Sequence, residues 1–218
     1  MGHYENGIET RNRILAACRK LFYQKGYDQT TFKDICQEAQ VNQSSIHYHF
    51  KTKDTLLKII YNESIQKNNL EVEKYCKEDT LPFAKYIFGG ELYLYKVLHD
   101  ARFLQFNLDA GRLLNAENLN DYIQTLASTL LYHDKNYSGL TEDNFYELMA
   151  SLGYDRIMLL NLSKNVNSLD HHQLSEHNME IYRRIMRISD DEYAMAKAQL
   201  SYLETRCNWD ALDTTLNI

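Results

Sequence analysis

A short polar stretch near the N-terminus carries the side chains best suited to hydrogen-bond chemistry. It reads Val41-Asn-Gln-Ser-Ser-Ile-His-Tyr-His-Phe50. As a helix it turns Val41, Ile46 and Phe50 inward and leaves a polar face outward. Gln can pair with adenine N6 and N7, Ser with base edges or phosphate oxygens, and Tyr and His with phosphates. The outward set comprises Gln43, Ser44, Ser45, His47 and Tyr48.

A second helix is expected directly before this stretch. Thr31 is its expected N-cap, and Asp34 follows three residues later. The turn between the two helices is three residues long. This is the helix-turn-helix arrangement, whose second helix enters the major groove of DNA. The apolar side of the helix that Thr31 begins comprises Phe32, Ile35, Cys36 and Ala39.

Composition and charge favour an all-α protein with an uneven charge distribution. The 218 residues include one proline, 44% are apolar, and the net charge is −6. Residues 1–53 hold eight Lys and Arg against five Asp and Glu, whereas residues 54–218 hold sixteen against twenty-five. The positive excess therefore coincides with the predicted helix-turn-helix, where phosphates would be met.

Other function classes find little support in the sequence. No apolar run is long enough to span a bilayer, and the four cysteines form no CxxC pair, so we expect a cytoplasmic protein with reduced thiols. The sequence contains no phosphate-binding loop, GxSxG or HExxH motif. We therefore expect neither an enzyme nor a bound cofactor.

Residues 10–60 resemble the DNA-binding domain of the TetR family of bacterial transcriptional regulators. The resemblance covers about a quarter of the chain, and its combined pattern is highly specific. The matching stretches are Arg13-Ile-Leu-Ala-Ala17, Leu21-Phe22, Lys25-Gly-Tyr27, Thr30-Thr-Phe-Lys-Asp-Ile35, Val41-Asn-Gln-Ser-Ser-Ile46, Tyr48-His-Phe50 and Lys51-Thr-Lys-Asp-Thr-Leu-Leu57.

The resemblance implies particular DNA contacts. Thr31 and Lys33 should meet the DNA backbone or nearby bases, and Tyr48 and His49 should approach the backbone. Lys53 should touch a phosphate. By the same resemblance, base edges or phosphates should be reached by Gln43, Ser44, Ser45 and His47.

The chain departs from the family pattern at two positions. Gln40 stands where the family usually has glycine, and a positive φ there would cost roughly 1 kcal/mol, unless the turn is built differently. His47 stands where the family often has tyrosine, so its DNA partner is open.

The rest of the chain reads as a series of helices. We expect a loose arm over residues 1–8, a first helix capped near Asn6 and ending before Gly26, and a fourth helix capped by Thr52. Pro82 should begin the next helix. Gly89-Gly90 indicates a kink, a break or a close packing point. Further helices are expected at about 99–114, 117–133, 141–166, 169–188 and 190–207, with caps at Thr141 and Ser189.

We therefore predict two domains: a helix-turn-helix DNA-binding domain at 1–53, and a helical effector-binding and dimerisation domain at 54–218. The second is rich in aromatic residues, which suit either a packed core or a pocket for an apolar or aromatic small molecule. From helix order and the resemblance, candidate pocket residues are Tyr93, Phe103, Asn107, Tyr122, Thr125, Tyr154 and Met158.

Two further features concern metal binding and dimerisation. His172 and His177 are five residues apart and should diverge on a helix, so a charged surface is expected there and no metal site. By the same resemblance, part of the apolar surface late in the chain should form a four-helix dimer interface; the alternative is that these residues only pack internally. They comprise Leu152, Ile157, Leu159, Leu160, Leu162, Met179, Ile181, Ile185, Met186 and Ile188.

The sequence thus favours a ligand-responsive transcriptional regulator, most simply a repressor. One short helix-turn-helix reads few bases, so a homodimer on a palindromic operator is expected, with double-stranded DNA and a small-molecule effector as partners. Two alternatives remain open. One is an architectural or protein-regulated DNA-binding protein without an effector, and the other is an enzyme or chaperone-like protein built on the same scaffold.

Overall fold

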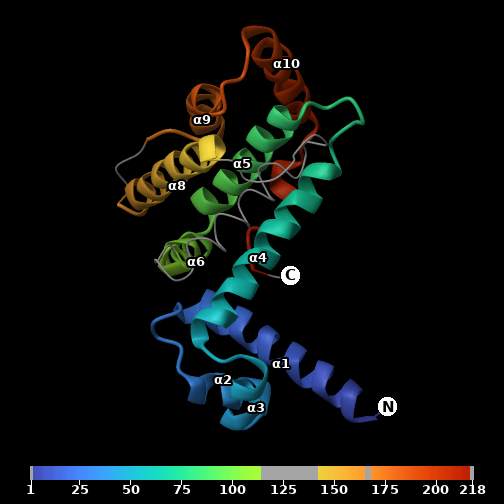
Figure 1. Ribbon diagram of the computed structural model, residues 1–218, viewed down its shortest axis with the longest axis vertical. Coiled ribbons are helices and arrows are strands. Elements are labelled where there is room, and N and C mark those ends of the chain that lie inside the picture. Colours follow the sequence, from blue (N-terminus) through green and yellow to red (C-terminus); the bar gives the residue numbers. More distant parts are fainter. Residues whose placement is uncertain (1, 114–141, 165–167, 217–218) are drawn as a thin grey trace.

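The computed structural model describes residues 2–113, 142–164 and 168–216. Every regular element in these ranges is a helix and none is a strand, which confirms the all-α prediction. Three N-terminal helices form a small unit below a larger helical body, and α4 connects the two (Figure 1). None of the described helices combines the length and the apolar character needed to cross a membrane.

The first helix, α1 (Gly2–Lys25), is longer than predicted. Residues 2–8 are helical, so the expected loose arm and the cap near Asn6 are wrong. No proline interrupts this stretch, and its one internal glycine, Gly7, costs a helix only about 1 kcal/mol. The other end agrees with the prediction: Gly26 has φ 83°, and its N–H donates to the carbonyl of Phe22.

The helix-turn-helix consists of α2 (Phe32–Ala39) and α3 (Gln43–His49). Thr31 caps α2 as predicted, in a reciprocal capping box with Asp34. Gln40 adopts the left-handed conformation, with φ 53° and ψ 48°, and thus takes the backbone position for which the family uses glycine. The Val41 N–H then donates to the Cys36 carbonyl at 3.0 Å and closes the turn.

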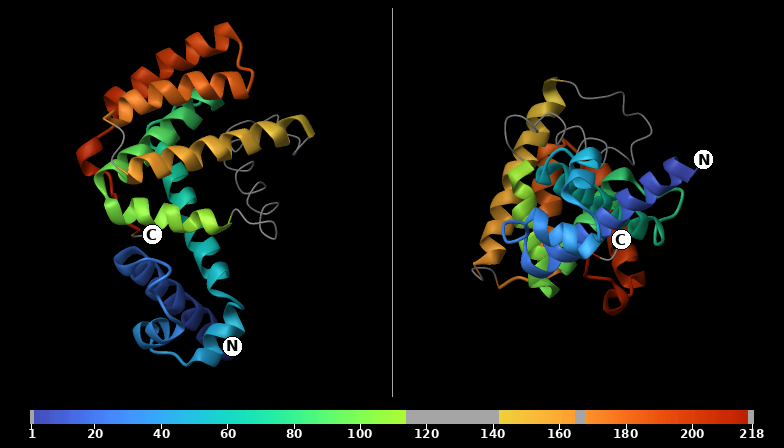
Figure 2. Two further views of the ribbon diagram at one scale, coloured as in Figure 1. Left: turned by 90° about the vertical axis from the view of Figure 1, so that its left-hand side faces the viewer. Right: turned by 90° about the horizontal axis from the view of Figure 1, so that it is seen from below.

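Helix α4 (Lys53–Glu73) carries the helix-turn-helix on the body and is continuous over 21 residues (Figure 2). Thr52 caps it as predicted. At its far end it packs against α5 (Pro82–His99), which Pro82 begins. The Gly89-Gly90 pair is a close packing point rather than a break. A Cβ on Gly89 would lie 3.2 Å from Val72, and Asn68 Nδ2 donates to the Gly89 carbonyl.

The remaining helices surround α5, which packs against α4, α6, α9 and α10. The predicted 99–114 helix corresponds to α6 and the short helix η1 that follows it, and Asp100 caps α6 by accepting from the Arg102 and Phe103 N–H groups. Ser189 caps α10 as predicted. The predicted 117–133 helix and the Thr141 cap lie outside the described residues. The remaining elements are α6 (Ala101–Ala110), η1 (Gly111–Leu113), α8 (Glu142–Ser163), α9 (His171–Ile185), α10 (Asp190–Arg206) and η2 (Trp209–Ala211).

Two clusters of buried side chains hold the helices together. The first runs without interruption from Phe22 and Ile46 in the N-terminal unit to Phe103 and Phe106 in the body. The second surrounds Phe88 on α5. The helix-turn-helix therefore shares its core with the body, and the division at residue 53 stays a prediction.

The late apolar residues divide between core and surface. Met179, Leu159 and Leu162 are buried, so much of the expected interface stripe packs internally. Ile157 and Leu160 on α8 are exposed instead.

The left-handed Gln40 gives a stability test. Gln40→Gly should raise the free energy of unfolding by up to about 1 kcal/mol, because glycine adopts this conformation without strain. Gln37→Gly, at an exposed position inside α2, should lower it by about 1 kcal/mol. Urea unfolding measures both, and equal losses in the two variants would contradict the strain argument.

Candidate nucleic-acid interface

The polar face of α3 points into solvent. Asn42 fixes the start of the helix by accepting from the Ser45 N–H at 2.8 Å and from the Ser45 hydroxyl at 2.9 Å. Buried Ile46 holds the opposite face in the core. Tyr48 is 85% exposed, although a tyrosine ring is usually at least half-buried. Gln43, Ser44 and His47 are also exposed, and Ser45 and His49 are half-buried.

Contacts within this face orient two of its side chains. Gln43 Nε2 lies 3.2 Å from His47 Nε2, one helical turn away. The His47 ring packs against Phe32 of α2 with ring centroids 5.1 Å apart. Histidine thus fills the position of the family's tyrosine by bridging α2 and α3, and it holds the Gln43 amide at the edge of the exposed face.

The start of α2 places Thr31 and Lys33 at the surface. The Thr31 N–H donates to Asp34 at 2.8 Å, so this group is not available to bind a phosphate. Hydrogen bonds from Lys25 and Thr31 hold the pKa of Asp34 well below its usual range, and this carboxylate stays charged. Lys33 is exposed at the start of α2 and contributes a positive charge there.

Lys53 is less available than its predicted phosphate contact requires. Its Nζ donates to the carbonyls of Tyr27 and Thr30, each at 2.9 Å, and lies 4.1 Å from the Tyr27 ring centroid. Burial lowers the pKa of this ammonium. Lys53 thus joins the α1–α2 loop to α4, and a phosphate could use only its third N–H.

An open groove of about 500 Å³ beside the helix-turn-helix was not predicted from the sequence. Arg13 lines it from α1, and Asn42 and Ser45 line it at the start of α3. Its polar and basic lining suits a stretch of DNA backbone. The charge of Arg13 was the available signal, but a helical repeat alone does not tell which face of α1 meets the turn. The other lining residues are Thr10, Cys36, Gln37, Gln40 and Val41.

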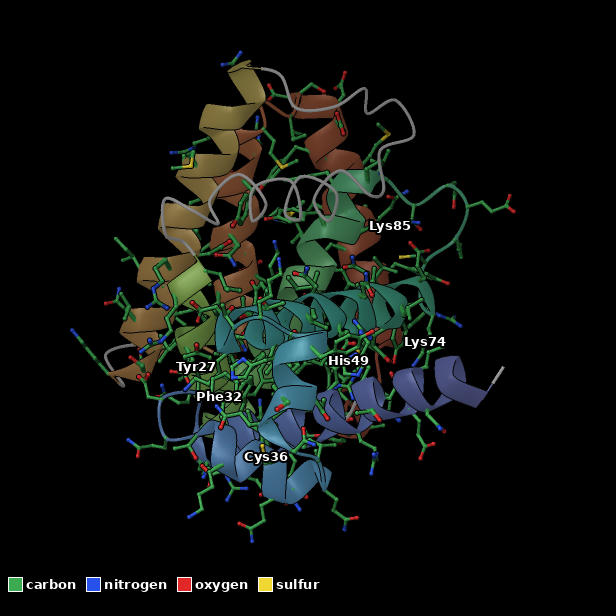
Figure 3. The ribbon with its side chains drawn as sticks, turned by 60° about the horizontal axis from the view of Figure 1, so that its bottom comes forward. Tyr27, Phe32, Cys36, His49, Lys74 and Lys85 are labelled. Carbon is green, nitrogen blue, oxygen red and sulfur yellow. The ribbon has the colours of Figure 1, made fainter. Side chains whose placement is uncertain are left out.

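The α1–α2 loop is also attached to α6. The Tyr27 N–H donates to Asp109 Oδ2 at 2.8 Å, and Arg112 pairs with Asp28 at 2.6 Å. Figure 3 shows Tyr27 at this junction, with Phe32 and Cys36 of α2 below it and His49, at the end of α3, to its right. The body therefore holds the helix-turn-helix through α6 as well as through α4.

The predicted pocket residues do not form one set. Tyr93, Phe103 and Met158 belong to the first buried cluster, and the rings of Tyr93 and Phe103 are 5.7 Å apart. Asn107 is buried beside Phe103, and its Oδ1 has no hydrogen-bond partner among the described residues. Tyr154 lies apart, against the second cluster. Tyr122 and Thr125 lie outside the described residues.

Comparison with known proteins agrees with this geometry. Residues 14–60 match the family described as bacterial regulatory proteins, tetR family. The chain is 25% identical over 150 residues to the biofilm operon icaADBC HTH-type negative transcriptional regulator IcaR of Staphylococcus epidermidis, covering 64% of this chain and 77% of IcaR. It is 36% identical over 56 residues to the HTH-type transcriptional regulator TtgR of Pseudomonas putida, covering 26% of this chain and 27% of TtgR.

Over residues 14–60 the chain is thus of the TetR family type. Its fold extends the likeness beyond the matched N-terminal residues. The crystal structure of RolR in complex with resorcinol superimposes with a TM-score of 0.53 at 15% identity, covering 94% of this chain and 97% of RolR. The likeness of fold to RolR thus includes the body.

The exposed residues of this TetR-type face give a binding test. Lys33→Ala should reduce the slope of log affinity against log salt concentration by about 1, because one phosphate contact is lost. Gln43→Ala should relax base preference at one operator position, by about 1–3 kcal/mol. Fluorescence anisotropy across a salt series measures both. Lys74→Ala, on the body, is the control and should leave the slope unchanged; an equal change there would contradict the assignment.

The contact between the α1–α2 loop and α6 gives a stability test. Asp109→Ala should lower the free energy of unfolding by about 1–3 kcal/mol, because it leaves the buried Tyr27 N–H without an acceptor. Asp28→Ala removes only the exposed pair with Arg112 and should cost less than about 1 kcal/mol. Chemical denaturation of both variants measures the difference, and the reverse order would overturn this account of the junction.

Proposed function

We propose that the protein is a cytoplasmic transcriptional repressor that binds a palindromic operator as a homodimer and is released by a small molecule bound in its body. The observation that carries the proposal is the polar face of α3, which is exposed at Tyr48 and Gln43 while Ile46 anchors it from behind. A helix presented in this way fits the major groove. IcaR, a named negative regulator, supports repression as the direction of control.

A surface suited to dimerisation lies on α10. Met195, Ala198 and Tyr202 follow one another at intervals of three and four residues and are all exposed, with Met195 at 54%. This spacing makes an apolar stripe along one helix face. A second copy packed against this stripe through a two-fold axis would place two α3 helices on one side of the dimer.

The proposed release by a ligand uses the two connections between body and helix-turn-helix. An effector beside Tyr93, Phe103 and Asn107 would contact α5 and α6, and the Asn107 Oδ1 offers it a hydrogen-bond acceptor. A shift of α6 reaches the α1–α2 loop through Asp109, and a shift of α4 reaches it through Lys53. If DNA and ligand favour different positions of these helices, each weakens the binding of the other.

The experiment that tests the function is binding of the purified protein to the DNA upstream of its own gene, across a salt series. Specific binding to a short palindrome with a stoichiometry of two chains is expected, and an unrelated duplex of equal length is the control. Selection from random duplexes extends the search to distant operators. Failure of the folded dimer to select any sequence would overturn the proposal.

The dimer surface gives a separate prediction. Ala198→Arg should convert the dimer to a monomer, because it places a charge in the centre of the apolar stripe. Sedimentation velocity measures the change, and operator affinity should fall in parallel. Ile157→Arg tests the alternative surface on α8, where Ile157 is 62% exposed. If Ile157→Arg is monomeric and Ala198→Arg remains a dimer, the interface lies on α8 and not on α10.

A further inference from the structure

A cluster of polar and aromatic side chains lies on the far side of α5 from the helix-turn-helix contacts. Glu91 on α5 is 0% exposed, although it carries a carboxyl group. The first two residues of α9, His171 and His172, face it, and Trp209 of η2 packs 4.5 Å from the His171 ring. The site thus joins α5, α9 and the end of the chain, and neither the DNA contacts nor the proposed effector region uses it.

The polar atoms of this cluster have few partners. Neither carboxyl oxygen of Glu91 has a donor in good hydrogen-bond geometry among the described residues, although His172 Nδ1 lies against Oε1. His171 Nε2 is also buried without a hydrogen-bond partner among the described residues, and the Ser175 hydroxyl lies beside Glu91 but makes no well-formed hydrogen bond with it. Buried polar groups are seldom left in this way, so the cluster lacks a component.

We propose that Glu91, His171 and His172 bind one divalent transition-metal ion, with Zn²⁺ as the ion that best fits the donor set. One carboxylate and two imidazoles are preferred zinc ligands, whereas Mg²⁺ and Ca²⁺ prefer oxygen alone. This site is independent of the proposed regulatory function.

The geometry suits such an ion with small movements. One ligand atom from each residue lies within 4.8 Å of the other two. Tetrahedral Zn²⁺ with bonds of about 2.0–2.2 Å requires ligand atoms about 3.3 Å apart. The widest separation must therefore contract by about 1.5 Å, and the close contact between His172 and Glu91 must open, both of which lie within side-chain rotation. The His172 side chain is 45% exposed and gives the ion a path from solvent.

Burial and neighbouring charges shift the pKa values of two of the proposed ligands. Burial, and then the neighbouring carboxyl of Glu204, raise the pKa of Glu91 above its usual range. Burial, and then His172, lower the pKa of His171 to about 4, so its imidazole is neutral with a free lone pair. Asp170, His99 and Cys207 are the other titratable groups nearby. Glu204 lies near Glu91 but is not part of the three-residue ligand set.

The test is isothermal titration calorimetry of the untagged full-length chain with Zn²⁺, with Mg²⁺ titrated in parallel. We expect one Zn²⁺ per chain and no saturable Mg²⁺ binding. Co²⁺ should occupy the site as well and give the intense visible absorption of a four-coordinate site.

Matched variants locate the site. Glu91→Gln keeps the size of the side chain and the neutral form expected without metal, so it should fold normally, yet weaken Zn²⁺ binding by more than the about 100-fold that an outer-shell change can cost. His172→Asn should weaken it similarly. His177→Asn, on the exposed side of α9, should leave it unchanged. Circular dichroism checks folding. Absence of saturable Zn²⁺ binding, or equal binding by wild type and folded Glu91→Gln, would overturn the proposal.

Discussion

The attachment of the α1–α2 loop to the body is the interaction on which the rest of the arrangement depends. Tyr27 is its centre: its N–H donates to Asp109 of α6, its carbonyl accepts from Lys53 of α4, and its hydroxyl meets Asp54. Burial, and then the hydrogen bond to Asp54, raise the pKa of this tyrosine well above its usual range, so the hydroxyl remains a donor. A single residue therefore ties the base of the DNA-reading unit to two helices of the body.

This attachment explains why the N-terminal unit and the body share a core. Phe22 and Ile46 belong to the same buried cluster as Phe106, so a movement of α6 cannot leave the helix-turn-helix unaffected. The polar face of α3 projects away from this shared core. The orientation of this face therefore depends on how the buried side chains behind α3 pack. Control of DNA binding from the body requires such a packed connection.

Helix α5 has a different role, because it supplies the centre of the body. Close approach at Gly89 lets α4 lie against it, and buried Lys96 donates to Asn68 of α4. Burial lowers the pKa of Lys96 to about 8. On another side of α5, Glu91 faces α9 and the end of the chain. Helix α5 thus contacts α4 through Lys96 and the proposed metal site through Glu91, and both of these side chains are polar and buried.

The sequence by itself determined the helices and much of the recognition face. Local hydrogen bonds explain this success, since Thr31, Thr52 and Ser189 each cap a helix through a partner three residues away. The same local reasoning failed at residues 2–8. The pattern at Asn6 predicts the start of a helix, but the chain is already helical from Gly2.

Only the tertiary structure decided the partners of individual side chains. The carbonyls that accept from Lys53 lie 23 and 26 residues before it, and His172 meets Glu91 from a helix far along the chain. From their spacing, His172 and His177 are predicted to diverge on a charged surface, whereas the fold places His172 against an acid on α5. Helical periodicity fixes which residues share a face, but the neighbour that a face meets depends on how distant helices pack, and this is why these contacts could not be read from the sequence.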